Sequence, residues 1–381
     1  MDPVVIIGSG YAGYSVAREF RRRNKEAQLL VLTADEGQFY SKPSLSEALS
    51  QGITPEALVN KTAQQMAAQI KGEVRTAVRV QALDPATRQI VLDRETIAYS
   101  QLVLALGADP LHLPLTNGTQ RRVLSVNDLA DYRRFVAAIA GKKSITILGA
   151  GLIGCEFAND LSQAGYQVDV IDLAAHPLSR LLPPENGHYL RNALQHRGVR
   201  WHLGTGVTAI ELQGHSVLIR CENGEELITD LVLSAIGLKP RTALAQAAGL
   251  AIHRGIVVDR QLRTSDPHIF ALGDCAEVAG QWLPYIAPIS LAAKVVATNL
   301  AGGEASACYP AMPVIVKTPA CPTVVCPPAQ EEPGEWTTEC DTDGMQSLFR
   351  DGAGALRGFA LQGSRAAQAP TLAPQLPMLF G

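Results

Sequence analysis

The residues best placed to do chemistry are glycines, which occur twice in the pattern Gly-x-Gly-x-x-Gly, at 8–13 and at 149–154. In such a turn the first glycine permits a tight bend, and the second lets a pyrophosphate approach the backbone. The third glycine allows the following helix to pack closely on the strand. Free N–H groups at the start of that helix bind the phosphates. Each copy of the pattern therefore predicts a dinucleotide-binding site.

Each glycine pattern has the strand and the helix that such a site requires. Residues 4–7, Val-Val-Ile-Ile, predict a buried parallel strand, and residues 14–23 have a helix-forming composition. The strand-like run 144–148 and the helix-like run 157–164 repeat this arrangement around the second pattern. Two complete copies are hard to explain by chance. They predict an α/β fold with two Rossmann-like domains.

The strand that follows each helix distinguishes the two sites, because an acid at its end binds ribose hydroxyls. The strand-like run at 167–171 ends in Asp172, whose charge would repel a 2′-phosphate. That unit is expected to bind NADH rather than NADPH. In the first unit the equivalent strand ends in Thr33 and Ala34, and Asp35 follows. Either the Thr33 hydroxyl or the Asp35 carboxylate could hold the ribose.

Further strands are predicted where apolar residues alternate or cluster. Residues 74–80 alternate with a period of two, and buried runs end at Gly107 and at Gly237. A buried strand at 269–272 delivers Gly273-Asp274 to its carboxyl end, where ligands bind on open α/β sheets. The simpler role for this aspartate is a helix N-cap. A helix is expected over 290–300, just after Pro288.

Composition narrows the class of protein. The chain has 381 residues, too many for one ordinary core, and is 47% hydrophobic, as is typical of globular α/β proteins. A net charge of −3 without a long basic run argues against nucleic acid as the main partner. No apolar run is long enough to span a membrane, and the first strand leaves no room for a signal peptide. A cytoplasmic protein with reduced thiols is expected, since its seven cysteines are scattered.

The order of these motifs resembles the two-dinucleotide-domain, FAD-dependent pyridine nucleotide reductases over nearly the whole chain. The second glycine pattern is followed by Thr-Ser-x-Pro-x-Ile-Phe-Ala-x-Gly-Asp at 264–274. The resemblance implies a glutathione-reductase-type fold with FAD tightly bound in the first domain and NADH as substrate in the second. It implies an FAD domain at 1–108 and 237–310, an NADH domain at 109–236, and a small α+β domain at 311–381.

The resemblance also implies site residues. Lys42, before Pro-x-Leu-Ser, would pair with Glu156 beside flavin N5, and these two are the expected catalytic residues. Thr33 and Ala34 would flank the adenosine ribose, and Val80 would meet the adenine through its backbone. The full set of expected cofactor contacts is Gly8, Ser9, Gly10, Tyr11, Ala12, Gly13, Thr33, Ala34, Lys42, Val80, Ala105, Gly107, Gly149, Gly151, Ile153, Gly154, Glu156, Asp172, Gly237, Gly273, Asp274, Ile286 and Lys317.

Cysteine usage within that family indicates the electron acceptor. Disulfide reductases and peroxidases carry cysteine shortly after the second strand, whereas this chain has none before Cys155. Electrons on the flavin therefore have no thiol relay there, and direct transfer to a one-electron carrier remains. The short C-terminal domain and the loop 40–46 look most like the NADH:rubredoxin reductases that serve alkane oxidation. Ferredoxin reductases of oxygenase systems are the nearest alternative, and a monomer is favoured over an oligomer.

Two other functions stay open. Cys321 and Cys326 have the Cys-x4-Cys spacing of a redox disulfide and would suit a peroxide or disulfide reductase. The strand-like run between them favours ordinary core thiols. The chain could also be a non-catalytic flavoprotein whose redox state controls a partner. No metal site is expected, because four thiolates at Cys-x2-Cys spacing, as in rubredoxin, are absent.

Overall fold

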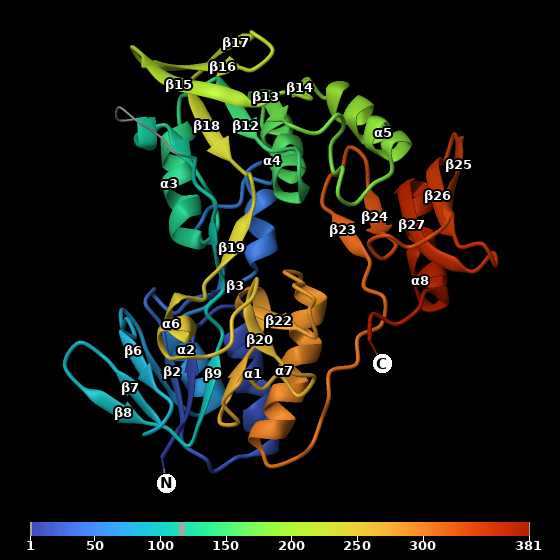
Figure 1. Ribbon diagram of the computed structural model, residues 1–381. Helices are drawn as coiled ribbons and strands as arrows, with labels where there is room; N and C mark the ends of the chain where they lie inside the picture. Colours follow the sequence, from blue (N-terminus) through green and yellow to red (C-terminus); the bar gives the residue numbers. More distant parts are fainter. Residues whose placement is uncertain (1, 114–118, 381) are drawn as a thin grey trace.

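The first glycine turn follows β1, the central strand of a five-stranded parallel sheet with the strand order β21-β9-β1-β2-β5 (Figure 1). This arrangement is seen in a computed structural model that describes residues 2–113 and 119–380. Side chains of helices α1, α2 and α7 join the strands in one buried apolar core. The strands are Val4–Ile7 (β1), Leu29–Leu32 (β2), Glu73–Arg75 (β5), Gln101–Leu104 (β9) and Ile269–Ala271 (β21), and the helices are Tyr11–Arg23 (α1), Ala63–Ile70 (α2) and Ile286–Leu300 (α7).

The second glycine turn lies on another five-stranded parallel sheet, with the order β11-β18-β12-β13-β14. A three-stranded antiparallel sheet, β15-β16-β17, shares a small apolar cluster with it. The elements are Val123–Leu124 (β11), Leu129–Ile139 (α3), Ser144–Leu148 (β12), Leu152–Gln163 (α4), Gln167–Asp172 (β13), Pro184–Gln195 (α5), Val199–Leu203 (β14), Val207–Gln213 (β15), Ser216–Cys221 (β16), Glu226–Thr229 (β17) and Leu231–Ser234 (β18). The predicted pair of Rossmann-like units is confirmed.

The last part of the chain forms a five-stranded antiparallel sheet, β23-β24-β27-β26-β25, with a short helix after it. This is the small α+β unit expected from the sequence. Apolar side chains of β23, β24 and β27 share a core with the second parallel sheet, so the two units are packed together. The elements are Val314–Val316 (β23), Thr323–Cys326 (β24), Glu335–Asp341 (β25), Gly344–Arg350 (β26), Leu356–Gly363 (β27) and Ala369–Leu372 (α8).

Short elements connect the units. The chain leaves the first parallel sheet through β10 and returns to it through β19, and these two strands pair antiparallel. The short 3₁₀ turn η1 contacts both α3 and α4 of the second unit. The remaining elements are Phe39–Tyr40 (β3), Lys42–Ser46 (η1), Val59–Lys61 (β4), Ala82–Asp84 (β6), Gln89–Val91 (β7), Thr96–Ala98 (β8), Ala108–Pro110 (β10), Leu238–Pro240 (β19), Ala243–Ala247 (α6), Ile256–Val258 (β20) and Ala276–Val278 (β22).

Two elements differ from the sequence prediction. The strand expected over 74–80 ends at Arg75, because Ala77 adopts a left-handed backbone with φ of 55°. Its N–H donates to the Asp35 carbonyl, which turns the chain out of the sheet. The helix expected over 290–300 begins at Ile286 instead. Its first turn can contain a proline, since the first N–H groups of a helix have no partner within it.

Candidate functional site

In the first glycine turn, protein atoms fill the space beside the first and last glycines, whereas the space beside the middle glycine is empty of protein atoms. A Cβ atom on Gly8 would lie 2.1 Å from the Ala105 carbonyl oxygen, and one on Gly13 would lie 1.9 Å from the Gly8 carbonyl oxygen. A Cβ on Gly10 would meet no atom within 4 Å. Gly10 is the N-cap of α1 and has no side-chain cap. The free N–H groups of this helix therefore face open space of the kind that a pyrophosphate requires.

The second glycine turn repeats this geometry. A Cβ on Gly149 would lie 2.6 Å from the Ala235 carbonyl oxygen, and one on Gly154 would lie 1.9 Å from the Gly149 carbonyl oxygen. A Cβ on Gly151, the N-cap of α4, would again meet nothing within 4 Å. The chain therefore has two helix N-termini built in the same way, each able to hold the phosphates of a dinucleotide.

A cluster of three polar side chains lies beside the first glycine turn, at the end of β2. The Ser9 hydroxyl donates to Thr33 Oγ1 at 2.8 Å, and the Thr33 hydroxyl donates to Asp35 Oδ1 at 2.6 Å. Thr33 is buried, while Ala34 and Asp35 are exposed. Of the two residues that the sequence left open for ribose binding, Asp35 is thus the exposed one and Thr33 helps to orient it.

Asp172 lies at the carboxyl end of β13 and contacts the second glycine turn directly. Its Oδ2 accepts the Ala150 N–H at 2.5 Å, and its Oδ1 accepts the Ala174 N–H at 2.7 Å. The carboxylate therefore fixes the backbone on both sides of the expected ribose position. A negative charge held here disfavours a second negative charge, such as a 2′-phosphate, at the same place.

The Gly-Asp motif lies against the first turn of α1. A Cβ on Gly273, which has a φ of 77°, would lie 3.0 Å from the Ala12 Cβ. Asp274 follows, and its carbonyl oxygen accepts the Trp282 indole N–H at 2.8 Å. Its carboxylate lies 3.7 Å from the Lys42 ammonium. The motif thus faces the glycine turn, although Gly273 lies 263 positions after Gly10, the pattern's second glycine.

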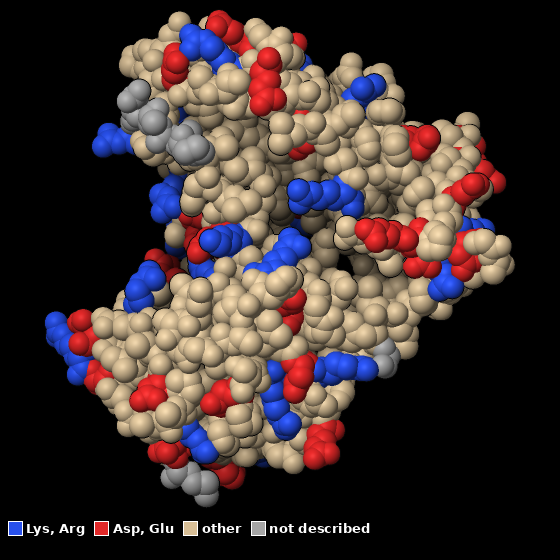
Figure 2. All heavy atoms as spheres, in the orientation of Figure 1, with Lys and Arg blue, Asp and Glu red and all other residues tan. Residues whose placement is uncertain are grey.

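The first turns of α1 and α7 lie together. The Tyr11 hydroxyl is 2.9 Å from the Ser290 hydroxyl, and Ile286 at the start of α7 is exposed. Both helices therefore present their positive ends to the same region, where a bound anion is favoured. Figure 2 shows Lys and Arg side chains across the middle of this face, between the two dinucleotide units. Their positive field favours the approach of anionic ligands.

Glu156 lies one turn into α4 and is 1% exposed. Its Oε2 lies 2.9 Å from the Lys317 ammonium and accepts the Ser46 hydroxyl at 2.6 Å. Its Oε1 accepts the Lys317 backbone N–H at 3.0 Å. The Lys317 ammonium also donates to Ser46 Oγ at 2.7 Å and to the Pro43 carbonyl oxygen. Residues of all three units therefore converge on this carboxylate.

The predicted pairing of Lys42 with Glu156 is wrong. The ion partner of Glu156 is Lys317, and the ion partner of Lys42 is Asp274. Lys42 opens the 3₁₀ turn η1, whereas Ser46 closes it, and only the closing end faces Glu156. The family resemblance implied that both lysines contact the flavin, but the sequence carried no signal for which of them reaches the acid. Ser46, which lies within the quoted loop, was not singled out.

The remaining predicted contacts lie at the edges of the two turns. Ala105 extends β9 by donating its N–H to the Ile7 carbonyl oxygen. Gly107 and Gly237 have φ values of 75° and 123°, which favour glycine. Ile153 is exposed in the first turn of α4, and Val80 is half-buried against the first core. The cofactor contacts of these residues stay predictions.

Cys321 and Cys326 of the C-terminal unit lack the features of a reactive pair. Cys321 is buried and Cys326 is half-buried, and both are free thiols. Burial raises the pKa of the Cys321 thiol and raises the pKa of Cys326 to about 11. Since the thiolate is the nucleophile, these environments favour inert core thiols.

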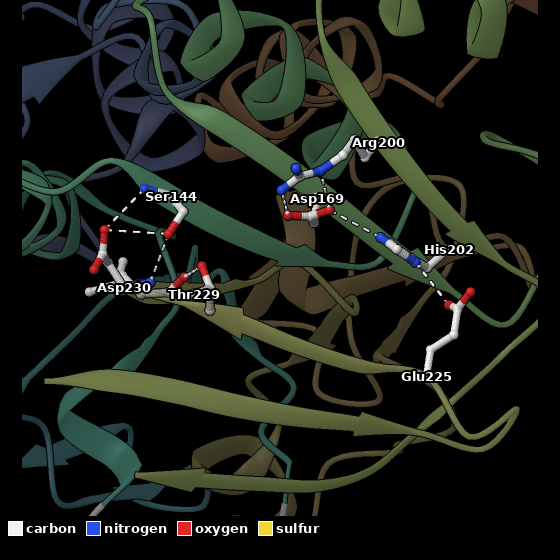
Figure 3. Close-up of polar contacts among 8 residues, drawn as sticks. Ser144, Asp169, Arg200, His202, Glu225, Thr229 and Asp230 are labelled. Carbon is white, nitrogen blue, oxygen red and sulfur yellow. Dashed lines mark hydrogen bonds and ion pairs between the residues drawn. The ribbon is translucent and has the colours of Figure 1, made fainter. Parts of the chain in front are cut away.

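A second polar cluster, around Asp169, lies on the second parallel sheet (Figure 3). The Asp169 carboxylate on β13 accepts the Arg200 Nε–H at 2.8 Å and lies 3.0 Å from the His202 Nε2. The other ring nitrogen of His202 lies 2.9 Å from Glu225. Burial alone would raise the pKa of Asp169, but the bonds from His202 and Arg200 hold it below its usual value. The hydrogen bond to Asp169 raises the pKa of His202.

Comparison with known proteins gives matches over almost the whole chain. Residues 2–294 match the family described as pyridine nucleotide-disulphide oxidoreductase, and residues 306–376 match the rubredoxin binding C-terminal domain. The rubredoxin-NAD(+) reductase of Alcanivorax borkumensis is 44% identical over 381 residues, which cover 100% of both chains. That of Acinetobacter baylyi is 43% identical over 389 residues, covering 100% of this chain and 99% of the relative.

Two solved structures of reductases are similar as well. Putidaredoxin reductase in its covalent complex with putidaredoxin has a TM-score of 0.89 at 26% identity. That match covers 99% of this chain and 94% of the other. The ferredoxin reductase for the CYP199A2 system from Rhodopseudomonas palustris has a TM-score of 0.88 at 28% identity, covering 98% and 93%.

Proposed function

Because this chain belongs to the pyridine nucleotide-disulphide oxidoreductase family and carries a rubredoxin-binding C-terminal domain, we propose that it transfers electrons from NADH through FAD to rubredoxin. It is an FAD-dependent oxidoreductase with NADH as its substrate. The observation that carries the proposal is the junction at Glu156, where two dinucleotide-type units and the rubredoxin-binding unit meet around one ion pair.

The open space above Gly10 and above Gly151 fits the phosphates of the two dinucleotides. We assign FAD to the turn at 8–13 and NADH to the turn at 149–154. When bound, the flavin supplies the ability to accept a hydride and to release electrons singly. The chain itself supplies the helix N-termini that hold the phosphates and the carboxylate of Asp172 that disfavours a 2′-phosphate.

Charged residues at the junction complete the proposed site. Lys42 lies beside Asp274, whose neighbour Gly273 packs against the start of α1, and Lys317 lies beside Glu156 on α4, so each cation is held by its own carboxylate. Such cations stabilise negative charge that develops during reduction. Glu156 keeps the Lys317 side chain in one position, because its burial leaves the carboxylate no alternative partner in solvent.

The domain limits and the cellular setting remain proposals. We assign 1–108 and 237–310 to FAD, 109–236 to NADH and 311–381 to rubredoxin binding. Within 2–113 and 119–380, no helix is both long enough and apolar enough to cross a membrane. We propose a cytoplasmic monomer that supplies an alkane hydroxylase system, on the basis of its resemblance to the reductases that do so.

The acceptor is tested by anaerobic stopped-flow spectroscopy of the FAD-loaded protein. NADH should bleach the flavin absorbance, and rubredoxin should then restore it faster than ferredoxin at the same concentration. Faster reoxidation by ferredoxin would support the alternative electron acceptor, and failure of NADH to bleach the flavin would support a non-catalytic flavoprotein.

The cysteine pair provides a separate test of the competing thiol mechanism. A Cys321→Ser, Cys326→Ser double variant should keep full turnover with NADH and rubredoxin, because both thiols are expected to be structural. Loss of turnover with normal FAD content would instead assign them a redox role.

A further inference from the structure

Three polar side chains line one face of helix α4. Asn159 and Asp160 follow Glu156 by three and four residues, so each lies next to Glu156 on the helix surface. All three are buried, and Asp160 is 1% exposed. Glu156 is accounted for by its pair with Lys317, but the other two have no role in the site described so far.

The Asp160 side chain accepts hydrogen bonds from backbone N–H groups of the first unit. Its Oδ1 accepts the Ser50 N–H at 2.8 Å, and its Oδ2 accepts the Leu49 N–H at 3.1 Å. Within the described parts of the chain, no Lys, Arg or His side chain forms an ion pair with it. A buried carboxylate without a cation is unfavourable unless its oxygens are hydrogen-bonded. Hydrogen bonds from these two N–H groups, which belong to the segment that follows η1, therefore offset the free-energy cost of burying the Asp160 carboxylate.

Asn159 holds the C-terminal unit in the same way. Its Oδ1 accepts the Ala320 N–H at 3.1 Å. Ala320 belongs to a tight turn in which the Cys321 N–H donates to the Thr318 carbonyl oxygen. Lys317 directly precedes that turn, so a bond to Ala320 limits where its ammonium can lie.

We infer that Asp160 is a positioning residue, which fixes segment 42–50 on α4 so that Ser46 reaches Glu156. The same helix begins at the turn assigned to NADH, so one rigid element sets the positions of the NADH phosphates and of the loop beside the flavin. The inference rests on the proposed function, since positioning matters only if hydride crosses between these two units. A small displacement of reacting groups is enough to slow such a transfer greatly.

The test is an Asp160→Asn variant of the FAD-loaded protein. An asparagine can accept one of the two N–H groups but presents a donor to the other. The limiting rate of flavin bleaching by NADH should fall at least about tenfold. The NADH concentration at half-maximal rate should stay within about twofold, because the variant leaves the phosphate-binding turn intact. The FAD content should be that of the wild type.

A readout independent of turnover accompanies the kinetics. Hydrogen exchange should show faster exchange of the Leu49 and Ser50 amides in the variant, because these amides lose a buried acceptor. Asp160→Glu, which keeps the charge but moves the carboxylate by one methylene, gives the same two readouts if the asparagine variant does not fold.

Asp169→Asn is the matched control. Asp169 is a buried carboxylate of the same unit, and its partners Arg200 and His202 lie on the neighbouring strand β14 (Figure 3). This control should unfold more easily yet bleach at the wild-type rate. Wild-type bleaching by the Asp160 variant, or equal slowing in the control, would overturn the inference. Failure of the wild type to bleach would instead overturn the proposed function, while the exchange of the two amides would still decide whether Asp160 holds the segment.

Discussion

Replacing Gly10 with valine should give a folded protein that does not retain FAD. The backbone at Gly10 has φ of −67° and ψ of −176°, an extended conformation open to every residue type. A Cβ there meets no protein atom within 4 Å. The fold therefore has no steric reason to reject the side chain, and loss of glycine's freedom in the unfolded chain even favours the variant by about 0.4–1 kcal/mol.

The expected loss of affinity follows from the hydrogen bonds that valine would block. A hydrogen bond to a charged group contributes about 1.5–3 kcal/mol. A side chain above the start of α1 would keep the phosphates away from at least two N–H groups, which amounts to about 3–6 kcal/mol. Affinity for FAD should then fall roughly 10²- to 10⁴-fold.

The assay is the flavin absorbance of purified Gly10→Val and wild-type protein, combined with thermal unfolding of the two apoproteins. Gly151→Val is the matched variant, and it should retain FAD while losing NADH. Gly13→Ala should behave differently, because its Cβ would lie 1.9 Å from a backbone oxygen and should destabilise the apoprotein itself. Full FAD content in Gly10→Val, or an apoprotein much less stable than the wild-type apoprotein, would refute the reasoning.

Three further changes test other parts of the site. Asp172→Ala should narrow the preference for NADH over NADPH in steady-state kinetics, and a wild-type enzyme that uses both equally would contradict the assignment. Lys317→Met should destabilise the apoprotein by about 3–5 kcal/mol in denaturant unfolding, since it leaves Glu156 buried without a cation, and adding Glu156→Gln should recover most of that loss. Because the pKa of His202 is raised, its stabilising effect is complete below pH 6.5 and is lost as pH rises through the folded-state pKa. His202→Gln should therefore lower the unfolding temperature more at pH 6 than at pH 9, and an equal loss at both would count against the charged form.

The fold could be predicted where local chemistry decides the structure. Glycine spacing and runs of β-branched residues fixed both dinucleotide units, and the two turns have matching geometry at each glycine. The prediction failed where the chain leaves regular structure. No residue in 74–80 predicts the left-handed backbone at Ala77, which depends on a hydrogen bond from its N–H to the Asp35 carbonyl oxygen in another segment. The early start of α7 at Ile286 is likewise permitted, but not required, by the sequence.

The site was less predictable because its contacts join distant parts of the chain. The family resemblance pointed to Lys42, Glu156 and Lys317, and it paired the first two. Partner choice depends on which end of η1 faces α4, and this is set by packing between units. Ser46 and Asp160 had no sequence signal at all, since a serine in a loop and an acid in a helix are common on protein surfaces.

The burial of Glu156 gives this junction a further property. Its carboxylate binds Ser46 of the first unit and Lys317 of the third, and Glu156 itself lies on α4 of the second unit. If any one unit moved away, a buried charge would lose part of its hydrogen bonding, and such losses are large compared with those at the surface. The pair of Lys42 and Asp274 holds the units less strongly, because it is partly exposed and its atoms are 3.7 Å apart, and such ion pairs contribute under about 1 kcal/mol. We therefore expect docking of the three units and assembly of the Glu156 cluster to occur together, because the carboxylate that Lys317 pairs with is buried at the point where the units meet.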